Sequence, residues 1–184
     1  MSRIIQSIQP RHSLAALELV QDVFTKHENE QEGKLVRSLV EEIRSKRFYL
    51  PELELTALDE EDQVIGYAMF SRFHLEGKYE NELLILTPVA VKTELQRQHI
   101  SKDLLEFGFE MAKEMGFRAV IVDGGPHNYR ARGFVTAANH GILPGQTVHL
   151  PHMDCLMVKE LQPGALEEIH GVVEYSDYRV LTQE

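Results

Sequence analysis

The stretch that decides the fold is Leu86–Phe117, which reads LTPVAVKTELQRQHISKDLLEFGFEMAKEMGF. It begins in the second half of an apolar run, Leu83–Val91, which is typical of a buried strand. Pro88 interrupts that run, and because proline has no N–H for a strand ladder, it predicts an edge or a bulge. Backbone groups beside such a break are free to pair with an extended ligand.

A polar loop and an amphipathic helix follow this strand. The loop is Gln96–Ser101, and the helix is predicted over Ser101–Met115 with Gly116 just past its end, where a left-handed residue commonly terminates a helix. A helix N-terminus exposes unsatisfied N–H groups and the positive end of the helix dipole, so the junction of loop and helix predicts a phosphate site. A phosphate-bearing ligand with a peptide-like arm, such as coenzyme A, would suit both the loop and the interrupted strand.

The segments on either side predict an α/β (α+β) fold with a central mixed twisted sheet flanked by helices. Arg118–Asp123 is predicted to be a short buried strand, so strand, helix and strand follow one another, which predicts parallel pairing with a right-handed crossover. The other predicted elements are a first strand at Ile4–Ile8, a helix capped by Ser13, a second helix after Gly33, a hairpin of Glu52–Leu58 and Val64–Leu75 around the acidic turn Asp59–Asp62, a short helix at His127–Arg132 and a last strand in Met153–Leu161.

Composition narrows the class of protein. We expect the 184 residues to form a single domain over residues 1–184. The formal net charge of −10 argues against a nucleic-acid partner, whose binding needs clustered Lys and Arg. No apolar run is long enough to span a bilayer, and the start of the chain has no secretory apolar segment, so we expect no membrane partner. The single cysteine, Cys155, fits a reducing compartment, and the expected location is cytoplasmic.

The order of these motifs resembles the GNAT superfamily of N-acetyltransferases. The family's acyl-CoA motif is a strand followed by Q/R-x-x-G-x-G/A at the start of a helix, and Gln96–Ser101 stands in that place. A second landmark, a tyrosine before a Gly-Phe pair, is matched by GGPHNYRARGF, Gly124–Phe134. The tail MDCLMVKELQPGALEEIHGVVEY, Met153–Tyr175, resembles a bacterial subgroup of predicted acetyltransferases. The resemblance covers most of the chain from Glu60 onward and implies a GNAT-like acyl-CoA N-acyltransferase fold with splayed central strands.

The resemblance also implies acetyl-CoA as cosubstrate and a direct attack of a primary amine on its thioester, without a covalent enzyme intermediate. The acceptor is expected to be a small-molecule or peptide amine. The backbone of the loop would bind the diphosphate, with positive charge from Arg97 and Lys102, and the strand would pair with pantetheine and polarise the thioester carbonyl. The residues expected to bind the cofactor are Val89, Ala90, Val91, Gln96, Arg97, Gln98, His99, Ile100, Ser101 and Lys102.

Two residues are candidates for catalysis. Tyr129 matches the family tyrosine and would protonate the departing CoA thiolate as a general acid, the alternative being a core tyrosine with a satisfied hydroxyl. The attacking amine must lose a proton, and Glu82 at the start of the interrupted strand is the first candidate for the base. Glu54 on the preceding hairpin is the second candidate. For both carboxylates the alternative is an ordinary position at a strand edge.

His99 and Ser101 stand where the family has glycines, which let the backbone approach the diphosphate and adopt positive φ. This departure leaves open a second function, a degenerate GNAT-fold ligand-binding or regulatory module without catalysis. A third reading is a homodimer whose C-terminal strand and tail mediate association. The cluster His149, His152, Asp154 and Cys155 runs from loop into strand, where alternate side chains diverge, so we expect no metal site.

Overall fold

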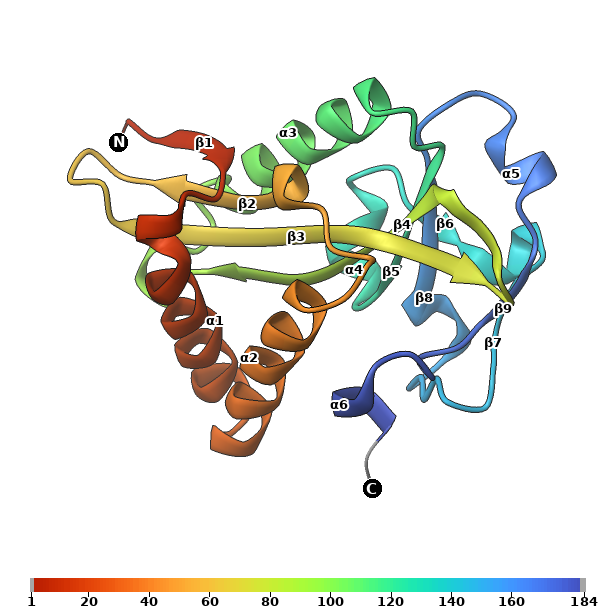
Figure 1. Cartoon of the computed structure of the whole chain (residues 1–184), viewed down its shortest axis with the longest axis horizontal. Helices are drawn as coiled ribbons and strands as arrows, with labels where there is room; N and C mark the ends of the chain where they lie inside the picture. The colour runs from red at the N-terminus through yellow and green to blue at the C-terminus, as the bar shows by residue number, and fades with distance from the viewer. Residues whose placement is uncertain (1, 183–184) are drawn as a thin grey trace. The chain divides into compact units, whose positions relative to one another are not determined.

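Seven strands form one mixed sheet in the computed structural model, which describes residues 2–182 (Figure 1). Their order is β1-β2-β3-β4-β5-β8-β6, and β7 and β9 pair separately. The predicted α/β class, a mixed sheet flanked by helices, is therefore confirmed. The strands are β1 (Ile4–Ser7), β2 (Glu54–Leu58), β3 (Val64–Leu75), β4 (Lys78–Val91), β5 (Ala119–Asp123), β6 (Val135–Thr136), β7 (Ile142–Pro144), β8 (Leu156–Glu160) and β9 (Gly171–Val173). The helices are α1 (Ser13–His27), α2 (Glu30–Arg44), α3 (Ile100–Glu114), α4 (Pro126–Arg130), α5 (Ala165–Glu168) and α6 (Arg179–Thr182).

The chain divides into two compact units. The first contains Met1–Phe70 and Pro88–Met111, and the second contains Ser71–Thr87 and Ala112–Glu184. The single domain over residues 1–184 stays a prediction. None of the described helices has the length and the apolar composition that crossing a membrane requires.

In the first unit, helices cover both faces of the antiparallel strands β1, β2 and β3. Figure 1 shows α1 and α2 on one side of β2 and β3 and α3 on the other. Successive side chains of a strand point to opposite faces, so β3 contacts both layers. Phe70 on β3 meets Phe109 of α3 edge to face, with 5.8 Å between ring centroids. Tyr67 lies on the opposite face of β3 from Phe70 and is completely buried.

Two helix starts differ from the prediction. Ser13 is the first residue of α1 and His12 precedes it as the N-cap, so the assignment of Ser13 as the cap was wrong. The second helix begins at Glu30, before Gly33, because the side chain of Asn29 caps it by accepting the Glu32 N–H at 2.8 Å. Gly33 lies inside α2 for a packing reason: a Cβ atom there would lie 2.0 Å from the Thr25 hydroxyl of α1.

A buried carboxylate joins α2 to the sheet in this unit. Glu54 is 1% exposed and accepts hydrogen bonds from Arg44 Nε at 2.8 Å and Tyr67 Oη at 2.5 Å, and also from Tyr49 Oη. Burial, followed by the charge of Glu54, raises the pKa of Tyr67 well above its usual value. Both oxygens of Glu54 are thus engaged within the fold, which gives this carboxylate a structural role.

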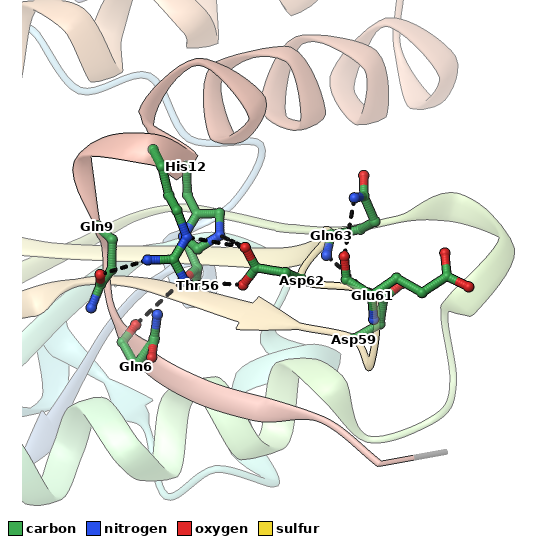
Figure 2. A network of polar contacts seen from close by, with 9 residues as sticks. Gln6, Gln9, His12, Thr56, Asp59, Glu61, Asp62 and Gln63 are labelled. Carbon is green, nitrogen blue, oxygen red and sulfur yellow. Dashed lines mark hydrogen bonds and ion pairs between the residues drawn. The ribbon is translucent and has the colours of Figure 1, made fainter.

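The β2–β3 turn is fixed to the start of α1 by Asp62 (Figure 2). Arg11 donates to its carboxylate from Nε at 3.0 Å, and His12 Nε2 lies 3.0 Å from the same oxygen. These contacts, led by the hydrogen bonds from Arg11 and His12, lower the pKa of Asp62 to about 2. Within the turn, Asp59 Oδ1 accepts the N–H groups of Glu61 and Gln63, both at 2.9 Å. The predicted hairpin with an acidic turn is confirmed.

In the second unit, the predicted parallel pairing of β4 and β5 is confirmed, but it is short. It covers Leu83–Ile85 against Ala119–Ile121 and stops there, whereas β5 stays paired with antiparallel β8 as far as Asp123. The parallel register between β4 and β5 thus covers three residues of each strand. Gly116, which ends α3, has a φ of 93° and so has the predicted left-handed conformation.

The contacts of Asp62 predict a pH-dependent contribution to stability. Because the pKa of Asp62 in the folded state lies below the value of about 3.9 expected in an unfolded chain, its contribution is present above about pH 4 and is lost as the pH falls towards 2. Asp62→Asn should lower the free energy of unfolding at about pH 6 and have progressively less effect towards about pH 2.5. Urea denaturation at several pH values measures this.

Glu61→Gln is the matched control, because it removes the same charge from the same turn and Glu61 has no ion-pair partner in residues 2–182. It should leave the unfolding free energy nearly unchanged across this pH range. A loss from Asp62→Asn that is equally large at both ends of the range would contradict the assignment of an ionic contact.

Candidate functional site

The loop before α3 presents a run of unpaired backbone amides. The N–H groups of residues 97–102 find no acceptor anywhere in the described chain. The run is bounded by Gln96, whose N–H donates to Thr93 O at 3.4 Å, and by Asp103, whose N–H donates to His99 O at 3.0 Å. Amides at a helix N-terminus carry the positive end of the helix dipole, so this segment can bind an anion.

Two residues of the loop have backbone conformations that glycine adopts more readily than other residues. Arg97 and His99 both have a φ of 65°, in the left-handed region that most residues avoid. Successive amides around left-handed residues form concave anion sites. Both side chains are exposed, so the imidazole of His99 is not buried in the loop. Ser101 is the second residue of α3 and has no need of positive φ.

Side chains from distant parts of the first unit hold this loop. Arg3 donates from Nη2 to the Gln98 carbonyl at 2.9 Å and from Nε to the Asp103 carboxylate at 2.8 Å. Gln96 Nε2 donates to Val91 O at 3.4 Å and lies 2.8 Å from a ring nitrogen of His27 at the end of α1. The sequence analysis missed Arg3, because no local pattern connects it to a loop about ninety residues later.

The predicted pantetheine-binding residues lie at the end of β4. Ala90 is 2% exposed and Val89 and Val91 are half-buried, so their side chains alternate as in a regular strand. The Lys92 N–H donates to Ile65 O on β3 at 2.9 Å.

The two predicted cationic side chains are exposed. Arg97 has no ion-pair partner in the part of the chain that the structure describes. Lys102 lies 3.9 Å from Glu106, one turn further along α3, at the limit of a surface ion pair. Both charges are accessible to an anion at the unpaired amides.

In the second unit, Tyr129 of α4 is held by its ring while its hydroxyl has no partner among the described residues. The ring meets Phe134 edge to face at 5.5 Å and lies against the backbone at Gly124, where a Cβ atom would be 2.7 Å from the ring. Burial raises the pKa of Tyr129 to about 12, despite a smaller opposing effect of Arg132. The hydroxyl therefore stays protonated near neutral pH and is available as a hydrogen-bond donor.

The carboxylate of Glu82 is engaged in an ion pair. Arg118 Nη1 lies 3.2 Å from Glu82 and 2.6 Å from Glu168, and the Arg118 N–H donates to Glu82 O at 2.7 Å. This contact joins β4 to the residue that precedes β5, next to the first paired residues Leu83 and Ala119. The catalytic role of Glu82 stays a prediction.

A second carboxylate of this unit was not singled out from the sequence. Asp123 ends β5, beyond the last residue paired with β4, and accepts a hydrogen bond from Tyr175 Oη at 2.9 Å. Its side chain reaches solvent, yet the surrounding protein raises its pKa by desolvation, which the hydrogen bond from Tyr175 partly opposes. Tyr175 belongs to the C-terminal segment, and its N–H donates to the Thr147 hydroxyl at 2.7 Å. No local motif joins residues so far apart.

The histidine and cysteine cluster of the same unit makes separate contacts. His152 Nε2 lies 3.7 Å from Cys155 Sγ, whereas Asp154 accepts from the Thr136 hydroxyl at 2.9 Å and lies 3.6 Å from Arg130. Over residues 2–182, no three His, Cys, Asp or Glu side chains are placed to hold a metal ion.

The chain is similar to known proteins both in sequence and in structure. The sequence model described as "Acetyltransferase (GNAT) family" matches residues 15–140. The Escherichia coli protein "Uncharacterized N-acetyltransferase YhbS" is 32% identical over 154 residues, which cover 82% of this chain and 84% of that protein. The crystal structure of Escherichia coli YhbS in complex with CoA is similar with a TM-score of 0.79 at 29% identity, covering 94% of this chain and 89% of that one. A GNAT acetyltransferase from Brucella melitensis in complex with acetyl-CoA has a TM-score of 0.71 at 22% identity, covering 95% and 96%, and shows the fold alone.

The contact between Gly124 and Tyr129 predicts a difference between two adjacent glycines. Gly124→Ala places a methyl group against the ring of Tyr129 and should lower the free energy of unfolding by about 1–3 kcal/mol, as overpacking does. Gly125→Ala is the control, because its Cβ would meet only the Asn128 side chain at 3.5 Å, an ordinary contact. Urea denaturation of the two variants measures the difference, and equal stabilities would show that the ring of Tyr129 is not fixed against Gly124.

Proposed function

Since this chain belongs to the GNAT family of acetyltransferases, we propose that it transfers an acetyl group from acetyl-CoA to a primary amine of a small molecule or peptide by direct attack. The observation that carries the proposal is the run of unpaired amides at residues 97–102, at the N-terminus of α3. A diphosphate needs several N–H donors and positive charge at one place, and this loop offers both. That a similar protein, Escherichia coli YhbS, holds CoA supports the choice of ligand.

The cofactor would bind through two segments of the first unit. The diphosphate lies on the amides of residues 97–102, with Arg97 and Lys102 beside it. The peptide-like pantetheine arm lies along Val89–Val91 on β4, whose backbone takes the place of a neighbouring strand. An N–H of this segment polarises the thioester carbonyl, which develops negative charge as the amine attacks.

The transfer forms a C–N bond and breaks a C–S bond. The lone pair of the neutral amine attacks the thioester carbonyl carbon, and the thiolate of CoA departs with the bonding electrons. Tyr129 donates a hydrogen bond to this sulfur. Because its pKa of about 12 exceeds that of an ordinary thiol, about 8.5, the tyrosine stabilises the thiolate more readily than it gives up its proton completely.

The amine must release a proton before or during the attack, and two carboxylates of the second unit are candidates for the base. Glu82 is bound to Arg118, which occupies an oxygen that a proton would reach. Asp123 reaches solvent and has a raised pKa, which makes it the better proton acceptor. We therefore favour Asp123, which also offers a negative charge to a cationic amine.

Acetyl-CoA binding is expected to depend on the backbone conformation at residue 99. His99→Gly should bind acetyl-CoA at least as tightly as the natural chain, because glycine adopts a φ of 65° without strain. His99→Val should bind about 5–30-fold more weakly than His99→Gly, because left-handed geometry costs a residue other than glycine roughly 1–2 kcal/mol. Calorimetric titration of both variants and the natural chain measures this, with thiol release from a panel of amines as the readout of transfer.

The results of these measurements distinguish an acetyltransferase from a ligand-binding module without catalysis. Binding together with amine-dependent thiol release supports the transferase. Binding to the natural chain without thiol release from any amine favours the module without catalysis, as does binding that appears only in His99→Gly. The lack of any thermal stabilisation by millimolar acetyl-CoA would contradict the proposal, because a ligand of the folded state must raise its stability.

Matched substitutions of Asp123 and Glu82 test which of the two carboxylates is the general base. Asp123→Asn should lower kcat by roughly 100-fold or more, the usual contribution of a general base, and leave the KM for acetyl-CoA almost unchanged. Glu82→Gln should change kcat only slightly and instead lower thermal stability through the loss of its contact with Arg118. Steady-state kinetics with one accepted amine distinguishes them, and the reverse order of effects would assign the base to Glu82.

A further inference from the structure

The amide loop at residues 97–102 contains two strained residues and no glycine. Arg97 and His99 are both left-handed, and left-handed geometry without glycine persists only where surrounding contacts hold it. From outside the loop, Arg3, which immediately precedes β1, makes the contact with the peptide between the two strained residues. Its guanidinium reaches the carbonyl of Gln98, the residue between the two strained ones.

We propose that Arg3 is a positioning residue for the coenzyme's diphosphate, which it orients through the peptide between Gln98 and His99 without touching the ligand. This inference rests on the proposed function, because it concerns the same anion site. Arg3 acts through the loop, so it is not a catalytic residue.

Peptide planarity gives the mechanism. The Gln98 carbonyl and the His99 N–H belong to one planar trans peptide, so they point in opposite directions. Because Arg3 Nη2 holds that carbonyl at 2.9 Å, the His99 N–H points away from Arg3 and stays free for an anion. The next peptide is fixed in the same way, since the His99 carbonyl accepts the Asp103 N–H at 3.0 Å and the Ile100 N–H points the other way.

The chemistry of the side chain suits this role. Arg3 binds two acceptors in different directions, the Gln98 carbonyl and the Asp103 carboxylate, which is possible because a guanidinium presents a rigid fork of donors. Its side chain is 18% exposed, and its contact with Asp103 is part-buried, whereas its contact with the Gln98 carbonyl is exposed. Asp103 lies in the first turn of α3, so Arg3 joins the loop to the helix that follows it.

The test is the binding of CoA to Arg3→Met and Arg3→Lys. Arg3→Met should weaken CoA binding about tenfold or more, the loss expected for a charge-assisted hydrogen bond, while kcat at saturating acetyl-CoA changes little. Arg3→Lys keeps the charge and should recover only part of the affinity, because an ammonium group cannot form the same fork. Calorimetric titration and the division of the effect between KM and kcat measure this.

Arg11→Met is the matched control. It removes another arginine of the first unit, one bound to Asp62 of the β2–β3 turn, and should leave CoA binding unchanged. If the natural chain binds CoA and Arg3→Met binds it equally well, the positioning role is wrong while the proposed function stands. Failure of the natural chain to bind CoA overturns the proposed function instead.

The role of Arg3 in fixing the loop can also be tested without ligand, even if the natural chain fails to bind CoA. At a φ near 65° the amide and α protons of the same residue lie unusually close, so in the free natural chain residue 99 should show a strong intraresidue nuclear Overhauser effect between these two protons. In Arg3→Lys this signal should weaken as other values of φ become populated, whereas in Arg11→Met it should not. An unchanged signal in Arg3→Lys would show that the loop keeps its conformation without the arginine fork, which overturns the role of Arg3.

Discussion

A run of peptide N–H groups in the loop before α3 must find acceptors outside the chain. The amides of residues 97–102 have none within the described structure, because the loop ends in the first turn of α3 and contains two left-handed residues. Backbone donors at a protein surface are satisfied by water until a better acceptor replaces it. A diphosphate is such an acceptor, because it is charged and presents several oxygens close together. The loop is therefore built to exchange water for an anion.

In the proposed reaction, the chemistry would lie with residues that the second unit positions by ordinary packing. Tyr129 is held by contacts of its ring with Phe134 and Gly124, which leave its hydroxyl without a partner among the described residues, and burial keeps that hydroxyl protonated. Asp123 ends β5 and is held by one hydrogen bond from Tyr175. The proposal thus assigns cofactor binding to backbone donors of one unit and proton handling to side chains of the other. Substitutions in the two units should accordingly affect different kinetic parameters.

Much of the fold could be predicted from local patterns. Strand, loop and helix around Leu86–Phe117 were evident because apolar periodicity and Gly116 act over a few residues. Tyr129 was singled out by the resemblance to the family, and its role stays a prediction. The start of α2 was predicted wrongly because it is set by a capping side chain that the apolar pattern does not include. Asn29 caps the helix, which therefore begins before Gly33. Arg3 and Tyr175 lay beyond prediction, because each contacts its partner only after distant segments have come together. The replacement of glycine by His99 was visible, but its consequence required the value of φ.

The most direct test is an NMR titration of the ¹⁵N-labelled chain with CoA, followed at each backbone amide. The account predicts that the amides of residues 97–102 show the largest changes, with downfield proton shifts, because they gain phosphate oxygens as acceptors. Dephospho-CoA should produce the same changes, because it keeps the diphosphate and lacks only the phosphate on the ribose. Shifts that leave residues 97–102 unchanged while others respond would show that the diphosphate binds elsewhere and would contradict the account.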